Sequence, residues 1–294
     1  MKTSSIAGLI RAWTLPMTVS LILLGASYAL FLRLRVNLFT MLLALFGSLL
    51  LHAGANVLND VNDVIKGVDT QNSPTAVYRD HPILRGEMDI KKATLLSYVI
   101  VSSGLITGAF VSLMTGPAVF LLELAGAISL FSYNGPLINL KAKGLGEFLV
   151  STVWGPLFVL GGFSATAMGK LSIYAFLVSI PSAMIMMSVI YSNNYRDIET
   201  DIKAGVKSFA YRTSKHAIQV YVSALIGAYA LQLVYVYMGF LPIYTLVSFI
   251  TVPYAFLLFN YFRIKSPDID ARTGMLFTVY NFLIVAGLVL SSFT

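Results

Sequence analysis

The chain has 294 residues, of which 57% are hydrophobic and only 11% are charged. Soluble globular domains carry about 25% charged residues, so this composition excludes a soluble domain and indicates an integral membrane protein. Cysteine is absent, which excludes disulfides, thiolate metal sites and cysteine nucleophiles. The net charge of +7 is typical of loop bias in a membrane protein, and we expect no nucleic-acid partner.

Long apolar runs predict nine membrane-spanning helices, since one span needs ~20 mostly apolar residues. The expected spans cover residues 12–32, 37–58, 93–114, 117–134, 147–166, 171–192, 217–239, 242–262 and 274–293. Continuous runs of this kind differ from the alternating segments of a transmembrane barrel. We therefore predict an all-α integral membrane fold in which residues 1–294 form a single polytopic domain.

Lys and Arg are distributed unevenly between the two sides of these spans. Seventeen of the twenty fall at the N-terminus, beginning with Lys2, or in the loops after spans two, four, six and eight; the others are Arg33, Arg35 and Lys170. Cytoplasmic loops carry the excess of Lys and Arg, so we expect a cell-membrane protein with a cytoplasmic N-terminus. Twelve of the thirteen acids share that side, the exception being Glu123. Polar chemistry is therefore expected at the cytoplasmic helix ends.

Two acid-rich clusters lie where apolar spans run out into water. Residues three and four apart share a helix face, so each cluster can form a polar stripe. The stripe after span two comprises Asn56, Asn59, Asp60 and Asp63, with Asp69 farther on. The stripe after span six comprises Asn194, Asp197 and Asp201.

The oxygen atoms of these side chains suit hard divalent cations, which often share their ligands with phosphates. Two or more Mg²⁺ ions held between the stripes bind a diphosphate and make it a better leaving group. This chemistry requires the ends of spans two and six to face each other across one pocket. The alternative is a pair of solvated helix ends whose acids pair with nearby basic residues. The recurrence of the pattern, and the cost of unpartnered Asn56 and Asn59 in an apolar run, favour the metal site.

The sequences of both clusters resemble the aspartate motifs of the UbiA superfamily of intramembrane prenyltransferases. The first reads Asn59-Asp60-x-x-Asp63 and continues to Gly67-Val68-Asp69; the second reads Asn193-Asn194-x-Arg196-Asp197-x-x-x-Asp201-x-Lys203-x-Gly205. Weaker matches are Arg11-Ala12-Trp13-Thr14-Leu15-Pro16 and Tyr133-x-x-Pro136. The resemblance implies nine helices around a central cavity, Mg²⁺ dependence, and transfer of a polyprenyl group from its diphosphate to a hydrophobic or aromatic acceptor within membrane lipid.

The resemblance also implies roles for individual residues by matched position. It assigns metal ligands to Asn59, Asp60, Asp63, Asn194, Asp197 and Asp201. It assigns diphosphate contacts to Arg79, Lys141, Lys203 and Lys207, the alternative being ordinary cytoplasmic-side charges. It implies catalytic roles for Asp69, as an acid near the acceptor, and for Tyr133, whose ring can face a carbocation. The alternative for Tyr133 is an anchor at the membrane interface.

The acceptor is suggested by the branch of the superfamily that the motifs are most similar to. The segment Lys66-Gly67-Val68-Asp69-Thr70 resembles the menaquinone-pathway branch, which prenylates 1,4-dihydroxy-2-naphthoate. The segment His81-Pro82-Ile83-Leu84-Arg85-Gly86 departs from it, because many members have Arg-Pro at its start. Two alternatives stay open: geranylgeranyl transfer to a glycerol-phosphate ether, as in archaeal-type lipid synthesis, and, from a different class, a cation-coupled secondary transporter.

Several other polar residues have simpler expectations. His52 is expected to be a hydrogen-bonded buried histidine, with a proton acceptor as the alternative. Glu123 is expected to pair with a Ser or Tyr of a neighbouring helix. His81 has no ligand partner at useful spacing, and Asp268 and Asp270 are expected in a solvated loop.

Overall fold

The computed structural model describes residues 3–294, so Lys2 of the charge count lies outside the described range. Every regular element between residues 3 and 294 is helical. The longer elements, in chain order, are α1 (Thr3–Leu9), α2 (Leu15–Phe31), α3 (Leu38–Ile65), α4 (Pro74–Tyr78), α5 (Ile90–Thr115), α6 (Ala118–Asn134), α7 (Gly146–Thr152), α8 (Phe158–Thr166), α9 (Ile173–Arg196), α10 (Ile198–Lys203), α11 (Phe209–Arg212), α12 (Ala217–Tyr237), α13 (Val252–Arg263) and α14 (Ile269–Phe293). Short 3₁₀ segments are η1 (Ala12–Thr14), η3 (Ser214–His216) and η4 (Ile243–Thr251), and η2 (Val153–Leu157) is a π-helix that joins α7 to α8.

The helical segments coincide with the nine apolar runs of the sequence. Eight segments within residues 3–294 are long and apolar enough to cross a membrane, and α6 is a shorter apolar helix of 17 residues. The all-helical prediction is confirmed, whereas the count of nine spans and the side of the N-terminus stay predictions. The main difference is in α3, which continues to Ile65, well past the expected end at residue 58. Because Asp60 and Asp63 are buried in the protein, the helix does not end where its apolar run ends.

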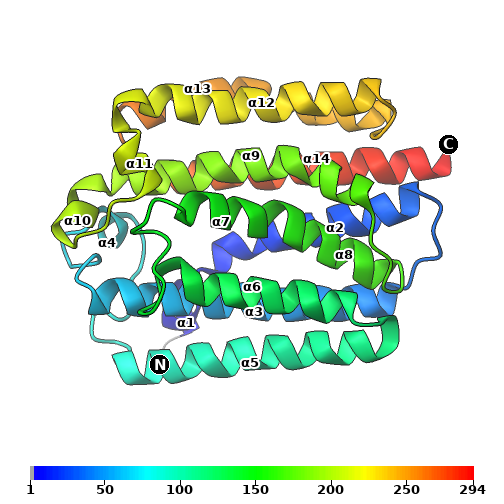
Figure 1. The fold of residues 1–294 in the computed structure, drawn as a ribbon. Coiled ribbons are helices and arrows are strands. Elements are labelled where there is room, and N and C mark those ends of the chain that lie inside the picture. Colours follow the sequence, from blue (N-terminus) through cyan, green and yellow to red (C-terminus); the bar gives the residue numbers. More distant parts are fainter. Residues whose placement is uncertain (1–2) are drawn as a thin grey trace.

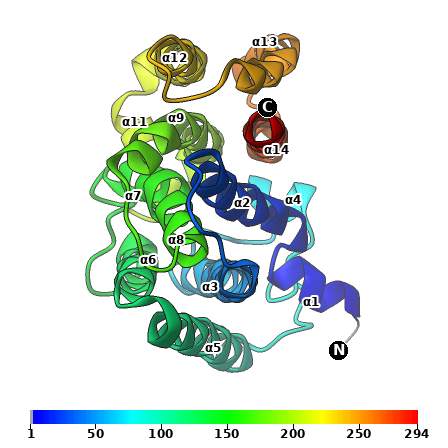
Figure 2. The same cartoon turned by 90° about the vertical axis from the view of Figure 1, so that its right-hand side faces the viewer.

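The helices run side by side along one long axis (Figure 1). Viewed end-on, α5 lies at one outer side and α12 and α13 lie at the opposite side, with α2, α3, α6, α7, α8, α9 and α14 between them (Figure 2). The loops that carry α4, α10 and α11 gather at one end of the bundle (Figure 1). The two acid clusters belong to this end, because α3 and α9 both terminate there.

Small residues and aromatic side chains hold the middle of the bundle together. A Cβ atom on Gly25 would lie 2.1 Å from the carbonyl oxygen of Val159, and one on Gly162 would lie 2.4 Å from that of Ile22. The backbones of α2 and α8 therefore approach closely, as glycines permit between membrane helices. The largest buried apolar cluster extends from α2 and α8 through α9 and α12 to α14.

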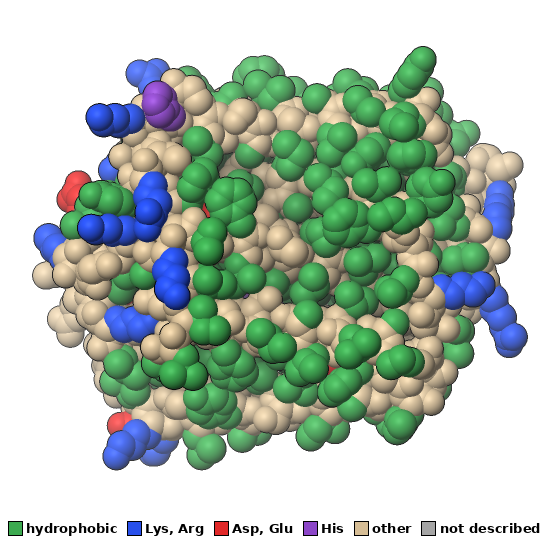
Figure 3. All heavy atoms as spheres, viewed as in Figure 1, with side chains coloured by type: hydrophobic (Ala, Val, Ile, Leu, Met, Phe, Trp, Pro, Cys, Tyr) green, Lys and Arg blue, Asp and Glu red, His purple; other side chains and the backbone are tan. Residues whose placement is uncertain are grey.

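The surface suits a lipid environment. Hydrophobic side chains cover a broad band in Figure 3, and Lys and Arg gather beyond it at the two ends, more of them at the end with α4, α10 and α11. Large apolar residues such as Leu113, Tyr237 and Phe256 are exposed. Since the surrounding lipid is itself apolar, this band has the pattern of a membrane protein.

Candidate active site

A cavity of about 600 Å³ occupies the middle of the bundle, lined by residues of α2, α3, α6, α7, α8, α9 and α14 and by Gly108 of α5. Its walls are mostly apolar along the helices and include Leu51, Leu122 and Met186. At the loop end it adjoins a small polar cavity of about 30 Å³. Arg11, Asn59, Tyr78 and Asn193 line both cavities, so a polar cavity lies next to an apolar one.

The small cavity brings the two acid clusters together. Asn59, Asp63 and Asp69 line it from the first cluster, and Asn193 and Asp197 line it from the second. The prediction that the ends of the two spans face each other across one pocket is therefore confirmed. The basic residues that line the same cavity are Arg11, Arg79 and Lys141. Three acids and three bases in one small space can hold cations and phosphate oxygens together.

The side chains of the expected polar stripe on α3 meet different partners. Asn59 donates through Nδ2 to Asp63 Oδ2 at 2.9 Å, and Asn134 of α6 donates to Asn59 Oδ1 at 2.9 Å and to Asp63 Oδ1 at 3.1 Å. Asn56 instead donates to the carbonyl of Ile10 at 2.9 Å. All four residues lie within one sector of ~100° on the helix, but Asn59 and Asp63 meet Asn134 whereas Asn56 meets the backbone of Ile10.

Asp60 is completely buried between two arginines. Arg79 donates to both of its oxygens, at 2.7 and 3.1 Å, and Arg11 pairs with the same carboxylate. Such bidentate pairs are among the stronger hydrogen bonds in proteins. Asp60 therefore acts as the counter-ion that holds two guanidinium groups beside the polar cavity. Its assignment as a metal ligand stays a prediction.

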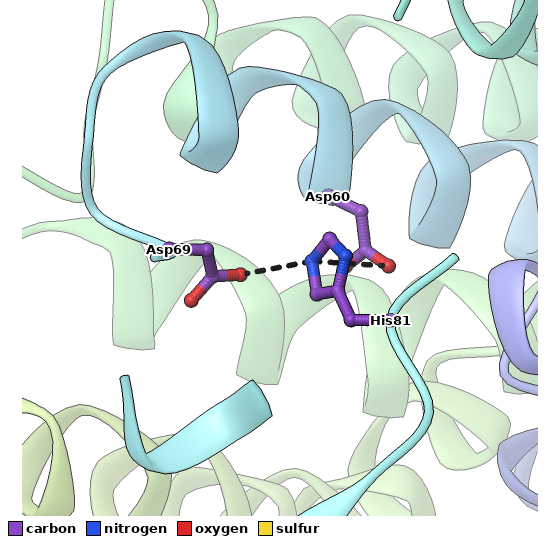
Figure 4. A group of neighbouring side chains, drawn as sticks. All are labelled: Asp60, Asp69 and His81. Atoms are coloured by element: carbon purple, nitrogen blue, oxygen red, sulfur yellow. Dashed lines mark ion pairs between the residues drawn. The ribbon is translucent and has the colours of Figure 1, made fainter. Parts of the chain in front are cut away.

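His81 joins Asp60 to Asp69, as Figure 4 shows. Its Nε2 lies 3.4 Å from Asp69 Oδ2 and 3.9 Å from Asp60 Oδ2. The expectation that His81 has no useful partner is wrong, because the loop after α4 returns it to the end of α3. Ligand atoms of the three residues lie within 4.8 Å of one another. Two arginines already balance the two carboxylates, however, so this group by itself has little net negative charge to attract a divalent cation.

The second cluster lies where one helix ends and another begins. Asp197 caps α9 and immediately precedes α10. Arg196 donates to its two oxygens at 2.8 and 2.7 Å. Asp201 is buried and accepts a hydrogen bond of 2.9 Å from Lys141, while its Oδ2 has no hydrogen-bond partner in the described part of the chain. Lys141 thus reaches from the loop after α6 to the second cluster.

Burial and charge move the acidity of these groups in opposite directions. Burial raises the pKa of Asp201, although Lys141 acts against it. Burial would also raise the pKa of Asp69, but its close contact with His81 and the charge of Arg79 outweigh it and keep the pKa below its usual range. Burial would lower the pKa of Lys141, yet Asp201 and Asp63 raise it well above normal. Asp69 and Lys141 are therefore held in their charged forms.

The remaining predicted site residues lie in different surroundings. Tyr133 lines the large cavity. Asn194 is buried beside the site, but it is Asn193 that lines both cavities. Lys203 and Lys207 are exposed and line neither cavity. Their assignments stay predictions, as do those of the other candidate residues.

Several residues at the site carried no clear signal in the sequence. Arg11 and Asn134 line the cavities from segments far from either cluster. Asp270 is not in a solvated loop as expected, because it pairs with Arg196 at 2.6 Å and lines the large cavity. Asp268, two residues earlier, does pair with Arg272 on a partly exposed surface. A polar residue within a turn of an apolar helix end is the one pattern these residues share.

Two polar residues lie deeper in the large cavity. His52 is buried, with Nδ1 2.9 Å from Thr18 Oγ1 and Nε2 3.2 Å from Thr14 Oγ1, which confirms the hydrogen-bonded histidine. Its ring meets Trp154 edge-on at 4.4 Å. Glu123 lines the far part of the cavity, and its buried Oε2 has no hydrogen-bond partner among residues 3–294. The expected Ser or Tyr partner for that oxygen is therefore wrong.

Comparisons with known proteins identify relatives along most of the chain. The 1,4-dihydroxy-2-naphthoate octaprenyltransferase of Bacillus subtilis (strain 168) is 29% identical over 248 residues, which cover 83% of this chain and 78% of the relative. A UbiA prenyltransferase domain-containing protein 1 homolog of Drosophila melanogaster is 28% identical over 269 residues, covering 90% and 72%. A UbiA homolog from Archaeoglobus fulgidus, solved with DMAPP and Mg²⁺, superposes with a TM-score of 0.65 at 17% identity, covering 96% of this chain and 99% of that one.

A sequence model of the UbiA prenyltransferase family matches residues 13–282, which is most of the chain and includes both acid clusters. The structural likeness independently shows the same fold. The chain therefore belongs to the UbiA prenyltransferase family.

Proposed function

We propose that this protein transfers a polyprenyl group from an allylic diphosphate to an aromatic acceptor of the 1,4-dihydroxy-2-naphthoate type, in a Mg²⁺-dependent reaction. The observation that carries the proposal is the polar cavity that both acid clusters line, next to an apolar cavity of about 600 Å³. The similarity to a naphthoate octaprenyltransferase along 83% of the chain supports this acceptor class.

The donor set of the polar cavity fits Mg²⁺. Asn59, Asp63, Asp69 and Asp197 supply oxygen ligands, which this ion prefers. A volume of about 30 Å³ exceeds the ~10–15 Å³ that one water-sized guest needs. The unpartnered buried Oδ2 of Asp201 is a further oxygen that a cation can satisfy. When bound, Mg²⁺ neutralises the diphosphate and makes it a better leaving group.

The basic residues of the polar cavity are suited to the diphosphate oxygens. Arg11 and Arg79 are fixed in place by Asp60, and Lys141 is fixed by Asp201. Because their counter-ions hold the side chains before the substrate arrives, little conformational entropy is lost on binding. We infer that Arg11, Arg79 and Lys141 bind the diphosphate.

The large cavity is suited to the prenyl chain. Its apolar walls accept the tail, and the bundle keeps water from the allylic cation that forms when the diphosphate leaves. Tyr133 and Trp154 line this cavity, and aromatic faces attract positive charge. Asp69, whose Oδ2 lies 3.4 Å from His81 Nε2, is our candidate for the acidic residue near the acceptor. From the loop charges we infer a site that opens to the cytoplasmic side.

The test is to incubate the purified protein with geranylgeranyl diphosphate, Mg²⁺ and a panel of acceptors, and to identify products by mass spectrometry. We expect a prenylated naphthoate that disappears with EDTA and returns with Mg²⁺. A glycerol-phosphate ether as the product would change the assigned acceptor class but would still identify the reaction as prenyl transfer. Turnover in excess chelator would contradict the metal site. Metal-dependent flux of substrate across proteoliposomes without any product would favour a transporter.

A further inference from the structure

Arg196 lies at the centre of a hydrogen-bond network that extends beyond the two acid clusters. It is buried, and all five of its N–H donors are directed at acceptors. Two of them hold the carboxylate of Asp197. A third donates to Asn193 Oδ1 at 2.9 Å. The other two, on Nη1, reach Asp270 Oδ1 at 2.6 Å and the carbonyl of Pro267 at 2.7 Å. One guanidinium is thus shared between two carboxylates.

Asp270 uses both of its oxygens in this network. Oδ1 accepts from Arg196, and Oδ2 accepts from the hydroxyl of Tyr78 at 2.8 Å. The Tyr78 ring also faces the guanidinium of Arg196, 4.9 Å from its centre to Cζ. Asp270 lies in the first turn of α14, where the helix dipole favours a negative charge. It therefore ties α14, the loop after the first cluster and the end of α9 to one another.

The sharing of charge matters because Asp197 also lines the polar cavity. If Arg196 paired with Asp197 alone, the pair would be close to neutral and would attract a cation weakly. With Asp270 as a second counter-ion, the group of two carboxylates and one guanidinium keeps one net negative charge. Outer carboxylates of this kind commonly orient and tune metal ligands in proteins.

We propose that Asp270 is a positioning residue for the second cluster, because by sharing the charge of Arg196 it leaves Asp197 free to hold a divalent cation. The proposal rests on the function proposed above. Asp270 itself does not line the polar cavity, so it acts through Arg196 and Tyr78 and not as a ligand. The chemical class recognised is a hard divalent cation bound together with a diphosphate.

The test compares Asp270→Asn with Asp268→Asn in the full-length protein in detergent. Asp268 is a matched control, because it lies two residues away and pairs with Arg272, each side chain being 37% exposed. Binding of Mn²⁺ in the presence of inorganic pyrophosphate is measured by electron paramagnetic resonance. We expect the Mn²⁺ Kd to rise about tenfold or more in Asp270→Asn, which is the range typical of such outer-shell changes, and to stay unchanged in Asp268→Asn.

A second readout separates positioning from damage to the fold. In Asp270→Asn the Mg²⁺ concentration for half-maximal prenyl transfer should rise by a similar factor, while kcat at saturating Mg²⁺ stays near wild type. Tyr78→Phe removes only the hydroxyl bonded to Asp270, so it should raise the Mn²⁺ Kd by a smaller factor. This variant provides the test if Asp270→Asn does not fold. If Asp270→Asn folds and its Mn²⁺ affinity is unchanged, this inference is overturned but the proposed function is not. If only Tyr78→Phe folds, an unchanged Mn²⁺ affinity in that variant has the same consequence. Absence of Mn²⁺ binding in the wild type overturns the proposed function as well.

Discussion

The two acid clusters have similar sequences but different structures. The helix of the first cluster continues through it to Ile65, and Asp60 meets two arginines while Asp63 meets two asparagines. The helix of the second ends at Arg196, and Asp197 lies at the break before α10. In each cluster arginine holds one aspartate, yet Asp60 does not line the polar cavity and Asp197 does. The comparison teaches that motifs of similar sequence differ in geometry when one helix is continuous and the other is broken.

The largest effect is expected where a buried ion pair is broken. Asp60→Asn leaves Arg79 buried and Arg11 partly buried beside a neutral side chain, and we expect a loss of about 3–5 kcal/mol in the free energy of unfolding. Unfolding in mixed micelles, followed by circular dichroism, measures the loss. The control Asp268→Asn, whose pair is partly exposed, should lose less than about 1 kcal/mol. Equal losses in the two variants would show that Asp60 is not the counter-ion described above.

The next effect tests one acid of each cluster by its activity. Asp63→Ala and Asp197→Ala should each lower the rate of prenyl transfer by at least about 100-fold, because both side chains line the polar cavity. This is the largest loss typical of residues that only support a metal ligand, and a ligand itself should cost at least as much. Product formation by mass spectrometry measures the loss, and gel filtration checks folding. Glu199→Ala is the matched control, since Glu199 is exposed and lines neither cavity. Near wild-type turnover in either aspartate variant would refute the assignment of that residue.

The smallest effect distinguishes the basic residues inside the site from those outside it. Lys141→Met removes a buried cation from the polar cavity, and we expect kcat/KM for the diphosphate to fall about tenfold or more. Lys203→Ala removes an exposed charge outside both cavities, and its effect should stay within about fivefold. A larger loss of kcat/KM in Lys203→Ala than in Lys141→Met would instead support Lys203 as a diphosphate-binding residue.

The sequence predicted the helices, the family and the meeting of the two clusters, because these depend on apolar length and on motif spacing. It did not predict which side chain each acid meets. Asp60 finds Arg11, 49 residues away, and Asp63 finds Asn134, 71 residues away. Helical periodicity reports the direction of a residue on its own helix, whereas a partner from another helix depends on packing. The same limit explains why His81 was expected to have no ligand partner and why Asp270 was expected in a solvated loop.

The hydrogen bonds around His52 restrict proton transfer in the large cavity. The single hydroxyl proton of Thr14 goes to the carbonyl of Arg11 at 2.7 Å, so Thr14 can only accept from His52 and Asn56. His52 must then carry its proton on Nε2, and Nδ1 accepts from the hydroxyl of Thr18. Both ring nitrogens are therefore engaged before any substrate enters. An aromatic acceptor that loses a proton on alkylation has to give it to some other base in this chamber.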